Sequence, residues 1–361
     1  MQIVTADKSG IDEAATVIRA GGLVAMPTET VYGLAADATD EEAVARIYEL
    51  KGRPGDNPLI LHIADKSTLN EITDTLPDYA NLLTDAYWPG PLTLVVRKKA
   101  SLPAWLGGHP NQVCETVGVR MPGHSATLSV IYQSGCIIAA PSANKAGKPS
   151  PTCAEHVIND YFAGEPSPDL LVDGGEANVG VESTVIDVTG NAPVILRHGA
   201  ITTQMIEETI NMKLSESIQK TRAPRAPGMK YKHYAPNAPM TLLRGTPENV
   251  AAYITTQIVA DIDAHIGVLV TPKVQACMDK NWRVMSIQGY STYTPLVTTR
   301  SLGENNEKIA KNLYANLREF DTRGVDIILA EALPEDGMGV AIMDRMTKAA
   351  AGRILDVGVY V

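Results

Sequence analysis

The stretch KGRPGDNPLILHI, residues 51–63, decides how the first part of the chain folds. Two cations, Lys51 and Arg53, flank a glycine, and we expect both to sit in the polar turn that follows, which contains two prolines. The apolar run Leu59-Ile60-Leu61 then predicts a buried strand, which ends near a lone histidine, His62. Cations and an imidazole are thus grouped around one strand, and strand ends are where open α/β sheets bind ligands.

Strands and helices alternate on both sides of this stretch. Apolar residues have helical spacing over Ile11–Ala20 and stop at Gly21-Gly22, after which LVAMP predicts a buried strand. The other elements predicted here are a helix over Glu41–Leu50, strands over Leu92–Val96 and Ile137–Ala140, a hairpin of STVIDV and PVILRHG, and a helix over Ile201–Ile210. The pattern is typical of an α/β fold.

A second α/β segment begins at Met240, where TLLRG, IGVLV and GVDIILAEAL predict strands and Asn305–Phe320 an amphipathic helix. Between the two lies RAPRAPGMKYKHYAP, within a segment from Lys213 to His233 that holds six cations against one acid, a local charge of +5. The length of 361 residues also suggests two domains. We therefore divide the chain into a domain at 1–211, a basic linker rich in Pro, Gly and Tyr at 212–239, and a domain at 240–361.

Composition excludes several classes of protein. The net charge of -10 argues against a surface built for nucleic acid. The four cysteines are scattered without a C-x-x-C pair, which argues against a zinc module or a disulfide framework. The first residues, MQIVTADKSG, do not resemble a signal peptide, and no apolar run reaches ~18 residues. We expect a cytoplasmic protein without a membrane segment.

The usual nucleotide-binding and hydrolase motifs are missing, including the P-loop, G-x-G-x-x-G and G-x-S-x-G. A phosphate site would therefore be built from cations, hydroxyls and turn amides. Such groups recur after predicted strands, in PTETVYGLAADA, KGRPGDNPLILHI, TVGVRMPGH, PSANKAGKPSPT, VGVESTVIDV and ILRHGAI. Each alone is compatible with a solvated loop or a helix cap, but together they indicate a polyanion bound beside a small polar molecule.

In this order, these motifs and WPGPLTLVV resemble the YrdC family. The linker APGMKYKHYAP and the tail EALPEDGMGVAIMDRMTKAA are similar to the long two-domain form of that family, the threonylcarbamoyl-AMP synthases. The resemblance implies a twisted open mixed sheet with a basic cavity, followed by a smaller Rossmann-like α/β domain. It implies a nucleotidyltransferase that converts L-threonine, bicarbonate or CO2, and ATP into threonylcarbamoyl-AMP and pyrophosphate. A separate transferase complex would pass the product to tRNAs that read codons starting with A.

The resemblance also implies roles for individual residues. The family's K-x-R and S-x-N signature falls on Lys51, Arg53, Ser142 and Asn144, which would be catalytic. The threonine pocket would consist of Thr30, His62, Arg120, Ala140 and Ser183. Contacts to ATP would come from Arg53, Asn57, Thr116, Ser142, Ser150, Arg197 and Tyr234.

Physical chemistry is consistent with these roles. Arg120 or His62 can hold the substrate carboxylate, and Lys51 and Arg53 can stabilise charge that builds on the phosphates. No side chain stands out as the general base. We expect Mg2+ to arrive on ATP, because no dedicated carboxylate cluster for a protein-bound metal is visible.

Two other functions remain open at this stage. One is a YrdC-like module that binds double-stranded or transfer RNA without chemistry; ATP turnover without RNA would exclude it. The other is a carbamoyl-transfer maturation enzyme of the hydrogenase type, which would carry C-x-x-C zinc repeats that this chain lacks. For the synthase itself, we expect at most a weak contact with tRNA. We also expect the basic linker to close over the N-terminal cavity when ATP binds and to exclude water.

Overall fold

The computed structural model describes residues 1–161, 166–214, 233–287 and 296–358. The chain forms two compact units, the first made of Met1–Ala146 and Ser150–Tyr231, the second of Gly147–Pro149 and Lys232–Val361. Within the described residues, no helix is long and apolar enough to cross a membrane. The linker at 212–239 is expected to close over the N-terminal cavity, and its residues 215–232 lie outside the described part of the chain.

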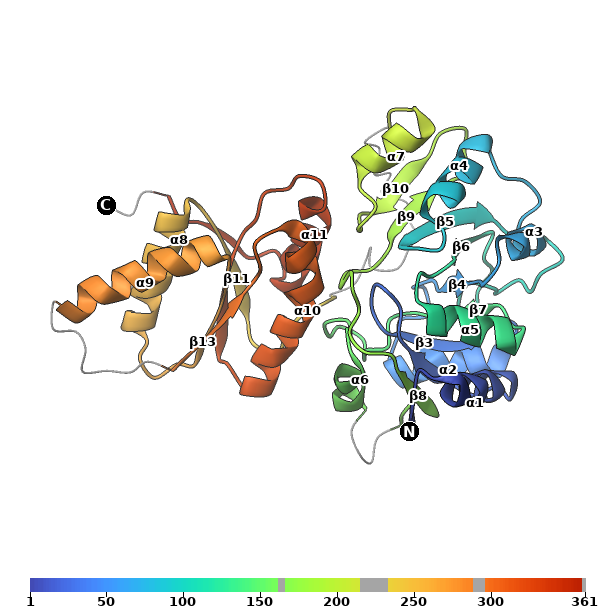
Figure 1. Cartoon of the computed structure of the whole chain (residues 1–361), viewed down its shortest axis with the longest axis horizontal. Coiled ribbons are helices and arrows are strands. Elements are labelled where there is room, and N and C mark those ends of the chain that lie inside the picture. The colour runs from blue at the N-terminus through green and yellow to red at the C-terminus, as the bar shows by residue number, and fades with distance from the viewer. Residues whose placement is uncertain (162–165, 215–232, 288–295, 359–361) are drawn as a thin grey trace. The chain divides into compact units, whose positions relative to one another are not determined.

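The first unit is built on a ten-stranded mixed sheet (Figure 1). In spatial order its strands are β1 (Gln2–Thr5), β8 (Leu170–Asp173), β2 (Val24–Met26), β3 (Gly33–Asp37), β7 (Ile138–Ala139), β4 (Ile60–His62), β6 (Thr116–Arg120), β5 (Leu92–Arg97), β9 (Thr184–Asp187) and β10 (Val194–Arg197). Strands far apart in sequence are neighbours in this order, so the sheet collects residues from most of the unit.

Helices cover both faces of this sheet, and the alternation of side chains along each strand supplies two cores. Val24 and Met26 of β2 pack in one core, which also holds residues of α1 and α5, while Ala25 points into the other. The second core also takes in α2 and α4. The helices are α1 (Lys8–Arg19), α2 (Glu41–Lys51), α3 (Leu69–Ile72), α4 (Asp78–Tyr87), α5 (Ser125–Ser134), α6 (Ala154–Asp160) and α7 (Thr203–Ile210), with a 3-10 turn at Lys66–Thr68.

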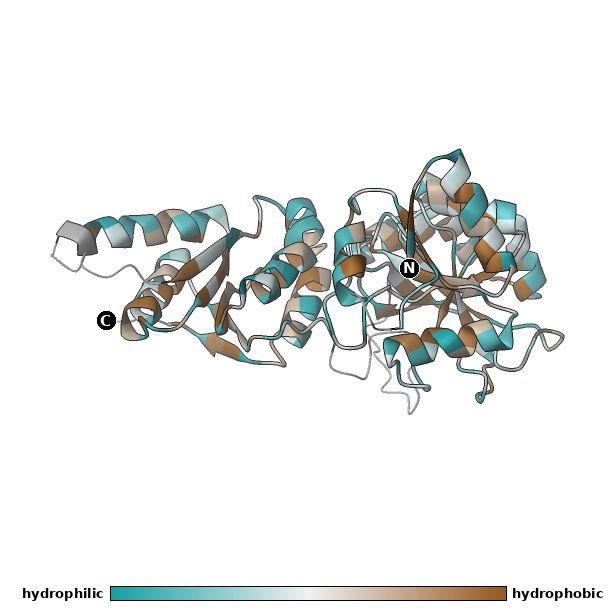
Figure 2. Cartoon of the chain, turned by 90° about the horizontal axis from the view of Figure 1, so that it is seen from below, coloured by the Kyte–Doolittle hydropathy of each residue, from teal (hydrophilic) through white to brown (hydrophobic). Residues whose placement is uncertain are grey.

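The second unit has a five-stranded parallel sheet. Its order is β13 (Val297–Ser301), β12 (Ile266–Val270), β14 (Ile327–Glu331), β11 (Met240–Arg244) and β15 (Ile354–Asp356). The helices are α8 (Pro247–Ala260), α9 (Pro272–Ile287), α10 (Asn306–Arg323) and α11 (Gly339–Ala349). In Figure 2 the strands of both units are largely hydrophobic, whereas the helices mix hydrophobic and hydrophilic residues.

These findings confirm the expected fold class, a large mixed sheet followed by a smaller Rossmann-like unit. The helix predicted over Glu41–Leu50 is α2, and the predicted hairpin is the antiparallel pair of β9 and β10.

Candidate active site

The opening stretch of the sequence is organised by the end of helix α2. The helix begins after Asp40, whose carboxylate accepts the backbone N–H groups of Glu42 and Ala43. It ends at Lys51 because Gly52 adopts a left-handed conformation with φ of 60°. Lys51 therefore lies in the last helical turn and is only 3% exposed, so the expectation that it sits in a polar turn is wrong. Arg53, half-buried, follows the glycine and does lie in the turn.

Buried Lys51 reaches the S-x-N motif across 91 residues of sequence. Its Nζ donates to the backbone carbonyls of Ser142, at 2.5 Å, and of Asn144. Ser142 also forms an isolated bridge with Gly33, directly after the PTET segment. The lysine and the S-x-N segment thus form one unit, since a buried ammonium needs such acceptors.

Arg53 organises the other side of the turn. Its guanidinium donates to the carbonyls of Asn57, at 3.1 Å, and Pro58, at 2.6 Å. The side-chain amide of Asn57 is 1% exposed, and neither of its polar atoms has a hydrogen-bond partner among the described residues. An unsatisfied buried amide is costly, and a ligand is one way to satisfy it.

Three of the residues expected to bind the substrate threonine, His62, Arg120 and Thr30, lie near the other end of strands β4 and β6. His62 and Arg120 are paired in register where these strands end. Arg120 Nη1 donates to Thr30 Oγ1 at 3.0 Å, and its Nε donates to the carbonyl of Gly90. Ala140 lies instead beside the start of β4, because its N–H donates to the carbonyl of Ile60.

His62 is a neutral imidazole in this setting. Burial and then the neighbouring charge of Arg120 lower the pKa of His62 to about 3. Its Nδ1 lies 3.2 Å from the carbonyl of Ile60, and a carbonyl can only accept, so Nδ1 carries the hydrogen. Nε2 is therefore a hydrogen-bond acceptor, and it has no partner among the described residues.

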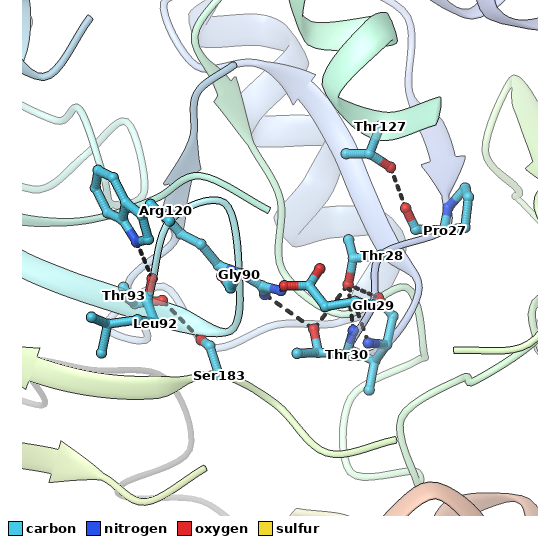
Figure 3. A network of polar contacts seen from close by, with 12 residues as sticks. Pro27, Thr28, Glu29, Thr30, Gly90, Leu92, Thr93, Arg120, Thr127 and Ser183 are labelled. Carbon is cyan, nitrogen blue, oxygen red and sulfur yellow. Dashed lines mark hydrogen bonds and ion pairs between the residues drawn. The ribbon is translucent and has the colours of Figure 1, made fainter. Parts of the chain in front are cut away.

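Glu29 is a residue that sequence analysis did not assign to the pocket. Its carboxylate forms an ion pair with Arg120 Nη2 at 2.6 Å, and Figure 3 shows it between Arg120 and the Thr28–Thr30 turn. Both side chains are largely buried, 5% exposed for Arg120 and 13% for Glu29. The signal available in the sequence is the acid directly before Thr30 in PTET.

Ser183 belongs to a neighbouring polar network. Its hydroxyl lies 2.8 Å from Thr93 Oγ1, a contact also drawn in Figure 3. Arg197 donates to both the carbonyl and the hydroxyl of Ser183, at 3.1 Å each. Ser150 donates to the buried carboxylate of Glu182 at 2.6 Å. Thr93 and Glu182 are further polar residues that the sequence patterns did not single out.

Two expected ATP contacts take no part in these networks. Thr116 begins β6, four residues before Arg120, so the two lie ~13 Å apart along the strand. Tyr234 belongs to the second unit, where its buried ring stacks on Tyr314 with 5.4 Å between centroids. Contact of either residue with ATP stays a prediction. In the described part of the chain, no group of three or more His, Cys, Asp or Glu side chains could hold a metal ion.

Comparison with known proteins agrees with the fold and shows the family. Residues 16–199 match the Sua5, YciO and YrdC family model, described as telomere recombination. Residues 201–351 match the model of the threonylcarbamoyl-AMP synthase C-terminal domain. The chain therefore belongs to the threonylcarbamoyl-AMP synthase family, and it is an enzyme of the transferase class.

Individual relatives span nearly the whole chain. The threonylcarbamoyl-AMP synthase of Pyrococcus abyssi is 42% identical over 347 residues, 95% of each chain. That of Bacillus subtilis is also 42% identical, over 96% of this chain and 94% of its own. The crystal structure of the P. abyssi Sua5 protein complexed with L-threonine superposes with a TM-score of 0.84 at 41% identity, covering 99% of this chain and 98% of that one.

Proposed function

We propose that this enzyme condenses L-threonine, bicarbonate or CO2, and ATP into threonylcarbamoyl-AMP with release of pyrophosphate. The neutral amine of threonine adds to the carbon of CO2 and its nitrogen releases one proton to solvent, which gives a carbamate; with bicarbonate as the carbon source, the same carbamate forms with loss of water. A carbamate oxygen then attacks the α-phosphorus of ATP, and the bond from that phosphorus to the β-phosphate oxygen breaks. The observation that carries the proposal is the buried group of Thr30, Arg120 and neutral His62, which suits a small hydroxylated amino acid.

Within this pocket, Arg120 binds the carboxylate of threonine. The guanidinium already holds a carboxylate, that of Glu29, at 2.6 Å in the same buried position. This contact is an ion pair without hydrogen-bond geometry among the described residues, and a substrate carboxylate could form the charge-assisted hydrogen bonds that the fork of an arginine offers. His62 serves a different group of the substrate, because Nε2 of the neutral ring accepts hydrogen bonds and therefore favours the hydroxyl or the amine. Ser183 and Ala140 complete the pocket.

ATP is proposed to lie toward the start of strands β4 and β6. Support comes from the unsatisfied amide of Asn57 and from the nearby guanidinium of Arg53. Lys51 acts mainly by holding the S-x-N segment in place, and Arg53 stabilises charge on the phosphates as pyrophosphate leaves. Ser142, Asn144, Ser150, Arg197, Thr116 and Tyr234 would complete the nucleotide contacts. Mg2+ would enter with ATP.

The product is unstable in water and is proposed to pass to a separate transferase complex that modifies tRNA. We propose that the enzyme is cytoplasmic and contacts tRNA weakly at most. One assay tests the core of the proposal: pyrophosphate release from ATP, with threonine, bicarbonate and the enzyme each omitted in turn and no RNA present. We expect release only in the complete mixture. Release that ignores threonine or bicarbonate, or none in the complete mixture, would overturn the proposal.

A further inference from the structure

The second unit contains a cavity that none of the proposed catalytic roles uses. Its volume is about 840 Å³, within the range of roughly 300–1,000 Å³ typical of small-molecule pockets. Its walls come from the segments that follow β11, β12, β13 and β14, and every lining residue belongs to the second unit. The carboxyl ends of four parallel strands therefore open into one cavity.

The topology of the sheet explains the cavity. Val268 of β12 packs in one core with residues of α8 and α9. Gly267, the residue before Val268, faces the other side of the sheet. A Cβ atom added at Gly267 would contact Phe320 of α10, so α10 covers that opposite face. The helix α11, which follows β14, packs against α10, so the neighbouring strands β12 and β14 lead into helices on opposite faces. Such a switch point leaves a crevice outside the carboxyl ends of the strands, where open α/β sheets bind ligands.

Two cations line this crevice. Arg244 ends β11 and Lys273 lies in the first turn of α9, and both are exposed. The first turn of α9 has no acidic residue, whereas those of α8 and α10 hold Glu248 and Glu307. A cation at the positive end of a helix is unfavourable unless an anion also binds there.

The acidic side chains of the cavity are partly engaged already. Glu331 accepts the backbone N–H of Thr271 at 2.7 Å, and Glu304 pairs with Lys308 at 2.7 Å. Glu335 is the remaining carboxylate, and Ile309 and Leu333 supply apolar wall. The cavity thus combines a cationic part, carboxylate acceptors suited to hydroxyl groups, and an apolar surface.

We propose that this cavity binds a small hydroxylated phosphate monoester, either a sugar phosphate or a nucleoside monophosphate. The phosphate lies between Arg244 and Lys273, hydroxyl groups donate to Glu331 and Glu335, and the remaining body rests on Ile309 and Leu333. The site would give the second unit a ligand of its own.

The test uses the full-length chain with isotopically labelled backbone amides. Ribose 5-phosphate, AMP and unphosphorylated ribose are titrated separately, and the amide signals of Gly245 and Gly303, which line the cavity, report binding. We expect saturable shifts with a phosphorylated probe and none with ribose. A stronger response to AMP identifies a nucleotide site, and a stronger response to ribose 5-phosphate identifies a sugar-phosphate site.

Substitutions make the result specific. Lys273→Ala should weaken binding roughly tenfold or more, as expected for loss of a charged hydrogen-bond partner. Lys280→Ala removes the same charge from an exposed position of the same helix, outside the cavity, and should leave binding unchanged. No shift with either phosphorylated probe, or equal affinity in the double variant Arg244→Ala/Lys273→Ala, would overturn the proposal. No threonine, ATP or pyrophosphate is involved, so the outcome is independent of the synthesis assay.

Discussion

The two sheets of this protein present polar chemistry in opposite ways. In the first unit, polar groups lie buried on the strands and tight turns, where His62 and Arg120 are 3% and 4% exposed. In the second unit, the strand β12 is apolar, and the polar groups that line the cavity stand at or beyond the carboxyl ends of the strands. Buried groups must be satisfied by fixed partners, whereas loop groups can use water. The first arrangement therefore favours selectivity, and the second tolerates substitution.

The sharpest test of this contrast is discrimination between threonine and valine. Valine lacks the hydroxyl and would leave buried groups such as His62 Nε2 without a partner. We expect kcat/KM for pyrophosphate release to favour threonine by a factor on the order of 10⁴. Serine keeps the hydroxyl and lacks one methyl group, so it should lose only about 10–200-fold. Equal rates with threonine and valine would show that the buried pocket does not recognise the hydroxyl of the substrate.

The buried ion pair of Glu29 and Arg120 should matter more to folding than an ion pair nearer the surface. Glu29→Ala leaves a buried guanidinium without its carboxylate, and we expect the free energy of unfolding to fall by roughly 3–5 kcal/mol in urea titrations. Added threonine should restore part of this loss, because its carboxylate can replace that of Glu29. The matched control is Glu319→Ala in the second unit, where the pair with Arg300 is about one-third exposed.

For that control, we expect a loss of at most about 1 kcal/mol that shrinks with added salt. Equal losses in the two variants would contradict the distinction between the buried and exposed pairs. Failure of threonine to stabilise the Glu29 variant would argue against Arg120 as the carboxylate site.

Arg53 offers a test in which rate and stability separate. Arg53→Ala should lower kcat by a factor on the order of 10²–10³ if the guanidinium stabilises charge in the transition state. Arg46→Ala is the control, since Arg46 is an exposed residue of α2 paired with Asp169. Arg53→Lys keeps the charge but lacks the fork that holds the carbonyls of Asn57 and Pro58. A normal kcat in Arg53→Ala would show that Arg53 is a loop residue that does not contribute to catalysis.

The smallest expected effect concerns pH and His62. The folded pKa of about 3 lies below the ordinary value of 6.5, so between these values the unfolded chain binds a proton that the folded chain does not. The contribution of His62 to the free energy of unfolding is therefore complete above pH 6.5. Below pH 6.5 it falls by about 1.4 kcal/mol per pH unit. Between pH 6.5 and 4.5, wild type should lose about 2–3 kcal/mol more unfolding free energy than His62→Gln. Parallel curves would show that His62 titrates normally.

Much of the fold could be predicted from local patterns, but the order of the strands could not. The helix at Glu41–Leu50 and the strand at residues 60–62 follow from periodicity and turn residues. The strand β3, Gly33–Asp37, was missed, because GLAAD lacks the alternation and β-branched residues that mark strands. Its place in the sheet depends on partners elsewhere in the chain.

The same limit applies to the candidate site. The K-x-R and S-x-N residues could be named from their motif, but the burial of Lys51 depends on carbonyls 91 and 93 residues away. The ion pair of Glu29 with Arg120 likewise joins two segments that no local pattern connects. Residue types were therefore predictable, and their partners were not.

The position of β8 between β1 and β2 has a consequence for synthesis of the protein on the ribosome. Residues Leu170–Asp173 separate two strands that emerge first, at Gln2–Thr5 and Val24–Met26. At translation speeds of about 5–20 residues per second, the first strands wait roughly 10–30 s for this partner. Until then β1 has no partner strand, and β2 can pair with β3 alone, so the nascent chain exposes apolar segments during this interval. Chaperones that bind extended apolar segments should therefore engage this chain while its first half is being made.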